Sequence, residues 1–140
     1  MPLWRFLDYI TADGVNLIQD WYSAQDEDVQ LQFDVTLDIL RAEANWEDPE
    51  VGEFKPLTRA HVGLGEIVFH TIIEDATRGK VRKRRFRPVG IWPVARHGEF
   101  ILILGCEKYG RTLIPHAAFD LALDYKSEFE AGRGTLSEHT

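Results

Sequence analysis

Cysteine is almost absent from this chain of 140 residues, which contains only Cys106. A lone cysteine excludes an intrachain disulfide and favours a reducing compartment, so we expect a cytoplasmic protein. No apolar run approaches the roughly 20 residues that a membrane-spanning helix needs. The N-terminal residues also lack the basic start and long apolar stretch of a secretory signal. We therefore predict no membrane association.

Internal repeats, low-complexity stretches and Pro/Gly/Ser-rich linkers are also missing, so we expect a single domain over residues 1–134. Residues 135–140 are predicted to form a disordered tail. The histidines have no short paired spacing and there is no glycine-rich phosphate loop, which argues against a zinc or nucleotide cofactor. Hydrophobic residues make up 44% of the chain, enough for a folded core.

Basic residues are outnumbered by acidic ones, 16 against 23, but they are concentrated in one place. The formal net charge is −7 at pH 7. Seven cations without an intervening acid fall in one short segment: Arg78, Lys80, Arg82, Lys83, Arg84, Arg85 and Arg87. Subtracting this +7 from the total leaves −14 on the rest of the chain. Charge segregated in this way creates a local positive field, which attracts a polyanion or an acidic partner.

The first half predicts a strand followed by two helices. Residues 4–10 read as the strand and residues 15–24 as the first helix, with a turn at Asp13-Gly14 between them. Asp26 is the expected N-cap of the second helix. That helix has two apolar stripes, one formed by Val29, Phe33, Leu37, Leu40 and Ala44, the other by Leu31, Val35 and Ile39. We interpret both stripes as core; the alternative is that the second stripe receives a partner helix.

The second half predicts three strands and a last helix. The strands cover residues 64–73, 81–94 and 100–106, with turns at residues 77–79 and 97–98. Pro88 and Pro93 make the middle strand an edge strand or a bulged one, whereas residues 100–106 are apolar on both faces and should be central. The helix is expected to begin at Pro115 and to stop at Gly132. This order predicts an α+β fold of two layers, an antiparallel meander packed against an N-terminal helical hairpin and a C-terminal helix.

Five short motifs follow one another in this second half. They are Phe54-Lys-Pro-Leu57, Gly63-Leu-Gly-Glu-Ile67, Arg85-Phe-Arg-Pro-Val-Gly90, the segment FILILGCEK at residues 100–108, and Pro115-His-Ala-Ala118. Their order and spacing resemble the RelE/ParE toxin superfamily, and within it the HigB-like, phage-derived branch. The resemblance covers roughly residues 54–126 and implies a RelE-like fold.

The resemblance also implies a function. Members of this superfamily are toxins of type II toxin–antitoxin systems, neutralised by an antitoxin, here expected to be of the helix-turn-helix type. Enzymatic members cut messenger RNA on the ribosome without a metal, and ParE-type relatives inhibit DNA gyrase. Two departures set this chain apart: Glu66 is followed by Ile67 and Val68 where an arginine is usual, and the chain is acidic overall.

Metal-free RNA cleavage needs a base, an acid and cations around the phosphorane. By the resemblance Arg87 occupies the aromatic-Arg position, and we take it as the first catalytic candidate. There are three other catalytic candidates. Lys55 could contact a phosphate, His61 could act as an acid or base, and Tyr109 could be a positioned hydrogen-bond donor. Candidates for binding RNA or the antitoxin are Arg82, Lys83, Arg84, Arg85, Arg59, Lys108 and Arg111. Glu66 is interpreted as a structural ion pair with a strand arginine.

The leading hypothesis is therefore a ribosome-associated messenger RNA endonuclease. The alternative is a non-catalytic RelE-like binding module, either a gyrase inhibitor or a degenerate phage-derived protein. The basic run also has a plainer interpretation, since charged side chains on an edge strand deter unwanted strand pairing.

Overall fold

The computed structural model describes residues 4–75, 77, 79–94 and 98–140. Within them the elements follow in the order β1 (Arg5–Ile10), α1 (Leu17–Ser23), α2 (Glu27–Ala42), β2 (Phe54–Pro56), η1 (Arg59–His61), β3 (Leu64–Ile67), β4 (Phe69–Asp75), β5 (Lys80–Phe86), β6 (Val89–Ile91), β7 (Glu99–Leu104), β8 (Glu107–Tyr109), β9 (Thr112–Ile114), α3 (Ala118–Glu130) and β10 (Thr135–Glu138). The fold is α+β, as the sequence predicts. None of the described helices combines the length and apolar composition that crossing a membrane requires.

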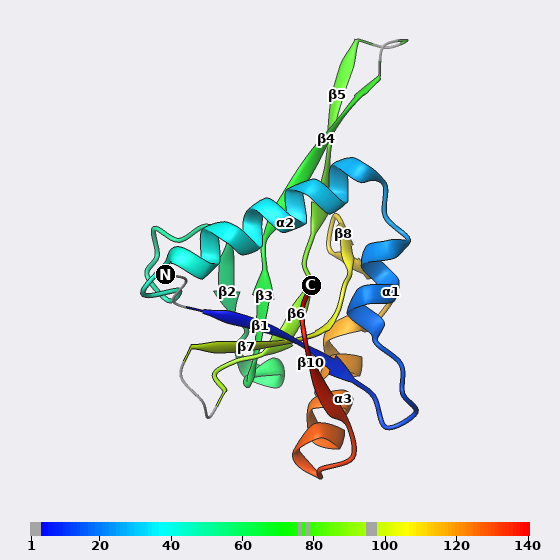
Figure 1. The fold of residues 1–140 in the computed structure, drawn as a ribbon. Coiled ribbons are helices and arrows are strands. Elements are labelled where there is room, and N and C mark those ends of the chain that lie inside the picture. The colour runs from blue at the N-terminus through cyan, green and yellow to red at the C-terminus, as the bar shows by residue number, and fades with distance from the viewer. Residues whose placement is uncertain (1–3, 76, 78, 95–97) are drawn as a thin grey trace.

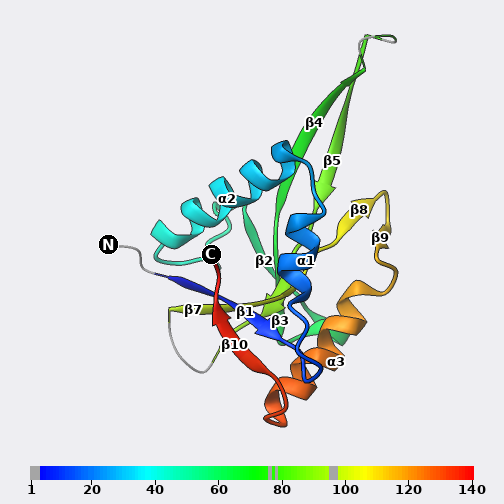
Figure 2. The same cartoon turned by 45° about the vertical axis from the view of Figure 1, so that its right-hand side comes forward.

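The described strands form two sheets. The larger has the order β10-β1-β7-β6-β3-β2, with β1 and β7 parallel and the other neighbours antiparallel. The smaller has the order β4-β5-β8-β9 and is antiparallel throughout. The hairpin of β4 and β5, which we call the arm, projects beyond the rest of the chain in both views (Figures 1 and 2).

Helices cover both faces of the larger sheet. Phe100 and Leu102 of β7 belong to the core that contains the buried residues of α1 and α2. Ile101 and Ile103 belong to a second core that includes Ala118 and Ala122 of α3. Alternate residues of a strand point to opposite faces, so β7 is buried on both sides, which confirms its predicted central place. The predicted arrangement had the helices in one layer, whereas α3 lies opposite α1 and α2.

Helix α2 begins where the sequence predicts. The Asp26 side chain accepts a hydrogen bond from the backbone N–H of Val29 at 3.1 Å, and one apolar stripe is buried: Val29, Phe33, Leu37 and Leu40. The second stripe is not core. Leu31, Val35 and Ile39, which we call the outer stripe, are 64%, 40% and 42% exposed. The interpretation of both stripes as core is therefore wrong for this one.

Two predicted strands are each divided between the sheets. The first breaks at Val68 into β3 and β4, and the second breaks at Arg87 and Pro88 into β5 and β6. Proline has no N–H to donate, and Pro88 instead accepts a hydrogen bond from the Ile67 N–H at 2.8 Å. The Arg87 N–H donates to the Cys106 carbonyl at 2.8 Å. The two breaks therefore lie side by side and form the junction between the arm and the body.

The C-terminal residues are ordered, so the predicted disordered tail is wrong. Strand β10 pairs with β1, and Arg5 forms ion pairs with both Glu138 and Glu99. His139 lies in the core, where its Nδ1 is 2.7 Å from Oδ1 of Asp8, a residue only 1% exposed. These long-range contacts hold a segment whose own sequence has no apolar pattern.

The last part of the chain differs from the prediction at the start of α3 and in one additional hairpin. Helix α3 begins at Ala118, after Ala117 with a φ of 56°, so Pro115 precedes the helix. The helix ends at Glu130, and Gly132 with a φ of +76° turns the chain, as expected. The β8–β9 hairpin has no counterpart in the sequence-based description. In the predicted turns at residues 77–79 and 97–98, Arg78 and His97 lie outside the described residues.

Candidate functional site

Charged side chains from four strands meet at the junction. Lys55 of β2 lies directly opposite Glu66 of β3, and Arg85 of β5 lies opposite Lys108 of β8. Glu66 alternates with Leu64, a residue of the core on the α3 side, so the cluster lies on that side. Arg87 joins it between the ends of β5 and β6. We call Lys55, Glu66, Arg85, Arg87 and Lys108 the junction cluster.

Glu66 is the only acid of this cluster, and it is half-buried. Burial raises the pKa of its carboxyl group, and the charges of Arg87, Lys55 and Lys108 partly oppose that shift. Within the described residues the carboxylate makes no hydrogen bond and no ion pair within 4.0 Å, although cations surround it. The predicted structural ion pair between Glu66 and a strand arginine is therefore not formed by direct contact.

The Glu66 oxygens are also accessible. No buried polar side-chain atom in the described part of the chain lacks a hydrogen-bond partner, so oxygens without a protein partner must reach solvent. The Arg87 guanidinium is oriented by its own strand, since Nη1 donates to the Phe86 carbonyl at 2.8 Å. The neighbouring Cys106 is fully buried and its Sγ donates to the Arg87 carbonyl. Burial, followed by the charge of Glu66, raises the pKa of this thiol to about 12, which leaves it inert at neutral pH.

The arm adds further cations next to the cluster. Arg82, Lys83 and Arg85 are exposed, and no described carboxylate lies within 4.0 Å of their charged groups. Arg82 is on the face of β5 opposite to Lys83 and Arg85, because residues alternate along a strand. Counting only the described side chains, cations without a carboxylate within 4.0 Å are therefore present on both faces of the arm. Arg78, the first cation of the predicted run, lies outside the described residues.

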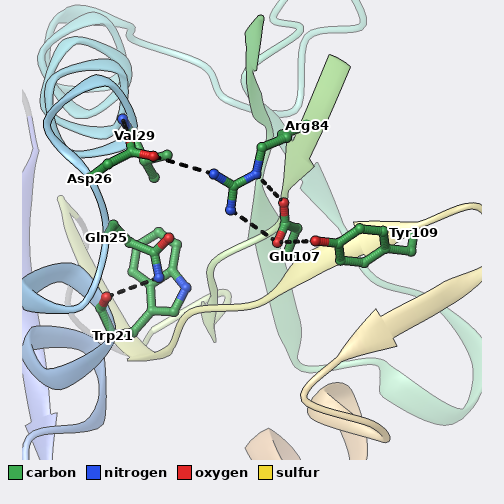
Figure 3. Close-up of polar contacts among 7 residues, drawn as sticks. All are labelled: Trp21, Gln25, Asp26, Val29, Arg84, Glu107 and Tyr109. Carbon is green, nitrogen blue, oxygen red and sulfur yellow. Dashed lines mark hydrogen bonds and ion pairs between the residues drawn. The ribbon is translucent and has the colours of Figure 1, made fainter. Parts of the chain in front are cut away.

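Arg84 differs from its neighbours because its charge is neutralised (Figure 3). Its Nε and Nη2 donate to the two carboxylate oxygens of Glu107 at 2.6 and 3.2 Å. Its Nη1 is 3.4 Å from Oδ2 of Asp26, the N-cap of α2. The Tyr109 hydroxyl donates to the same Glu107 at 2.9 Å. Arg84 and Tyr109, predicted as a binding and a catalytic residue, thus belong to a network that joins α2, β5 and β8.

Two predicted catalytic residues are held away from the junction cluster. Tyr109 and Lys108 are consecutive in β8, so their side chains point to opposite faces. His61 pairs with α3 instead, with its Nε2 at 2.7 Å from Oδ1 of Asp120 and its ring against Phe119. Arg59, in η1, and Arg111, in the β8–β9 turn, are exposed and are not among the charges that act on Glu66. From the predicted set, the structure therefore brings Lys55, Arg87 and Lys108 around Glu66 and places Arg85 beside Lys108.

Glu66 is the residue whose role the sequence-based description missed. The signal was present in part, because Glu66 lies at a fixed place in the Gly-Leu-Gly-Glu-Ile motif. Its position opposite Lys55, however, depends on the register of β2 against β3. Among the described residues, no group of three or more His, Cys, Asp or Glu side chains is placed to hold a metal ion.

Comparison of the chain with protein-family models, curated proteins and solved structures found no match. Membership of the RelE/ParE superfamily therefore stays a prediction. The side chains themselves indicate an anion site, because arginine and lysine bind phosphate oxygens and remain charged. An accessible carboxylate with a raised pKa among those cations is the arrangement expected of a general base beside a bound phosphate.

Proposed function

We propose that this chain binds the phosphate backbone of RNA through the arm and the junction cluster, and that it is a metal-independent endoribonuclease. In this proposal it is the toxin of a type II toxin–antitoxin system and acts in the cytoplasm, where messages are translated. One observation carries the proposal: the carboxylate of Glu66 has no ion-pair partner within 4.0 Å among the described residues, and it lies among Lys55, Arg87 and Lys108 at the base of the cationic arm. The motif resemblance supports it independently.

In the proposed reaction the ribose 2′-oxygen attacks the adjacent phosphorus while Glu66 accepts the hydroxyl proton. The bond from phosphorus to the 5′-oxygen breaks, which leaves a 2′,3′-cyclic phosphate and a 5′-hydroxyl. The 5′-oxygen receives its proton from a cluster ammonium group, Lys55 or Lys108, or from water. Arg87 stabilises the negative charge that grows on the phosphorane oxygens. The raised pKa of Glu66 makes it a stronger base than an ordinary carboxylate.

One arrangement favours a second candidate, a non-catalytic RNA-binding or protein-binding module. His61 and Tyr109, the predicted acid and positioned donor, are engaged by Asp120 and Glu107. Without either group near the cluster, the protonation of the leaving oxygen depends on a lysine or on water. A module of this kind would hold RNA or a partner through the same cations and leave the RNA intact.

Cleavage of messages on translating ribosomes by purified protein separates the two candidates. Glu66→Gln keeps the shape of the side chain and removes the base, so cleavage should fall by about 10²- to 10⁴-fold. Arg87→Ala should cause a comparable loss. The matched control is Glu50→Gln, a change at an exposed residue outside the cluster. Undiminished cleavage by Glu66→Gln would refute the assigned base, and intact messages with retained RNA binding would leave the second candidate.

Expression in cells gives a second readout. Induction of the wild-type chain should arrest growth, and Glu66→Gln and Arg87→Ala should relieve the arrest while accumulating as folded protein. Growth arrest with intact messages and DNA damage would instead indicate gyrase as the target.

A further inference from the structure

The free edge of β4 runs beside the outer stripe of α2. β4 is the first strand of the smaller sheet and its only strand neighbour among the described residues is β5. Beyond that ladder, no backbone hydrogen bond of residues 69–75 is found within the described part of the chain. Alternate N–H and C=O groups along the other edge of β4 are therefore available to pair with an added strand.

A groove of about 300 Å³ follows this edge. Its walls are Asp28, Leu31 and Gln32 of α2 and His70, Thr71 and Ile72 of β4. His70, Thr71 and Ile72 are consecutive and alternate between the two faces of the strand, so a groove that touches all three follows the edge and not one face. The space thus lies where the backbone of an additional strand would run.

The groove is apolar at its centre and exposed. Leu31 and Ile72 contact it and are 64% and 55% exposed. Val35 and Ile39 extend the apolar surface along the next two turns of α2. A phosphate chain has no favourable interaction with these side chains, whereas a peptide can bury them and pair with the β4 backbone at once. A protein segment is therefore the fitting occupant.

The charges around the groove indicate which charge the docked segment should carry. Lys83 is directly opposite Ile72, and Arg85 is opposite His70, so both cations lie one strand away from the added backbone. Neither has a described carboxylate within 4.0 Å. Among the described acids, Asp28 lies at the α2 wall, Glu74 lies towards the tip of the arm, and Asp38, which pairs with Arg41, lies along the outer stripe. An acidic side chain of the segment would thus be stabilised in the middle of β4, beside Lys83 and Arg85, and not at either acidic end.

We propose that the free edge of β4 and the outer stripe of α2 form the docking site for an extended, acidic segment of a partner protein, which adds to the arm as a strand. The segment's apolar residues pack on Leu31, on the face of β4 that carries Phe69 and packs against α2. Its acidic residues alternate to the other face, which carries Ile72, and there they approach Lys83 and Arg85. The same cations belong to the surface proposed above to hold RNA. The docked segment would therefore also compete with RNA for the arm. This part of the inference rests on the proposed RNA-binding function.

The probe is a synthetic peptide of about eight alternating valine and glutamate residues, a common strand length. A valine–lysine peptide of equal length is the charge control. Fluorescence anisotropy should show binding of the acidic peptide and at least tenfold weaker binding of the basic one. Hydrogen exchange should show new amide protection confined to β4, and not at β2, β9 or β10, the other sheet edges of the described fold. Protection at one of those edges, or equal binding of the two peptides, would overturn the proposal.

Two substitutions locate the site. Leu31→Gln should weaken peptide binding about tenfold, which corresponds to about 1.4 kcal/mol, while Leu136→Gln, at an apolar residue 39% exposed on β10, should not. Lys83→Glu should weaken it similarly, with Arg133→Glu as the charge control. If each substitution and its control weakened peptide binding equally, the proposed location of the docking site would be refuted.

The two proposals fail separately. Peptide binding to β4 without any RNA binding would refute the proposed RNA function and leave the docking site intact. RNA binding without peptide binding would refute the docking site and leave the proposed RNA function intact. Concentration-dependent dimerisation that protects β4 without added peptide would show that a second copy, and not a partner protein, occupies the edge.

Discussion

Asp8 is the residue on which the order of the C-terminal strand depends most. Its buried carboxylate accepts hydrogen bonds from three side chains: Asn16 at 3.0 Å, Gln19 at 3.1 Å and His139 at 2.7 Å. Asn16 is the N-cap of α1 and His139 follows β10, so one side chain joins both elements to β1. We predict that Asp8→Ala strongly destabilises the fold and releases β10.

The magnitude follows from what the substitution leaves behind. Leaving a buried hydrogen-bond donor without its partner costs about 1–3 kcal/mol, and Asp8→Ala removes the acceptor of three hydrogen bonds, so we expect a loss of about 3–5 kcal/mol. That is a large part of the roughly 5–15 kcal/mol by which a domain of this kind is stable. Asp8→Asn should cost less, since the amide still accepts a hydrogen bond and a neutral imidazole can accept one in return.

The pH dependence has a definite sign. Burial alone would raise the pKa of Asp8, but the hydrogen bonds from His139, Asn16 and Gln19 outweigh burial and hold the pKa below its ordinary value. A carboxyl group with a lowered pKa in the folded state stabilises the fold above its unfolded pKa of about 3.9, and this contribution disappears as the pH falls through the lower folded value. The acid-labile contribution should be absent from Asp8→Asn.

Urea unfolding followed by tryptophan fluorescence measures the effect. With a slope of about 2 kcal/mol/M, a loss of about 4 kcal/mol moves the midpoint by about 2 M. Asp13→Asn, in the exposed turn after β1, is the control. In Asp8→Ala, the rate of amide hydrogen exchange should rise more in β10 than in α3. A loss below about 1 kcal/mol for Asp8→Ala, or a loss equal to that of the control, would refute the role given to this residue.

Three further substitutions test other parts of the structure. Gly105→Ala should lower the melting temperature measured by calorimetry by several degrees, because the added Cβ would lie 2.0 Å from the Trp21 ring. Gly52→Ala is the control, since a Cβ there meets nothing within 4 Å. Tyr109→Phe should leave RNA binding unchanged and lower stability only slightly in denaturant unfolding, since its exposed hydroxyl donates to Glu107 and water can replace it. The cleavage rate should rise with pH through a midpoint above the ordinary glutamate pKa, and Glu66→Gln should lack that rise; a flat wild-type profile would contradict the assigned base.

Local signals predicted the helices well and strand membership poorly. The cap at Asp26 and the buried stripe of α2 depend on neighbours within one or two turns, so the sequence contains all that is needed. Whether the outer stripe is covered depends on the path of β4, which diverges from the body in the arm. An apolar pattern predicts that a face can be buried but does not determine what covers it. Both apolar stripes therefore looked alike from the sequence.

The strands failed for two different reasons. The break at Pro88 had a local signal, the missing N–H of proline, but the break at Val68 had none, because residues 64–73 read as one continuous strand. Strand β10 was missed because its residues are polar and exposed, and only the distant contacts of Glu138 and His139 hold it. Contacts between residues more than 130 positions apart leave no periodic trace in a sequence.

Many residues of the candidate site were predicted from the sequence, but their arrangement in space was not. The basic segment was evident, but its arginines are not equivalent. Arg84 lies on the same face of β5 as Phe86, the residue opposite Glu107, and its side chain reaches Glu107 diagonally and is neutralised, whereas Arg85 faces Lys108 and is not. That difference depends on strand pairing, as does the meeting of Lys55 with Glu66. Tyr109 and Lys108 were both predicted to belong to the site, one as a catalytic and one as a binding residue, although consecutive strand residues point to opposite faces.

The salt dependence of binding to a single-stranded RNA tests the central claim most directly. For single strands, each phosphate contact made by a cation contributes about 0.7 to the slope of log affinity against log salt concentration. Arg85→Gln and Arg87→Gln should each reduce that slope by about 0.7. Arg84→Gln, at the neighbouring but neutralised position, should leave it unchanged in folded protein. Equal slopes for all three variants and the wild type would contradict the account, as would an effect confined to Arg84→Gln.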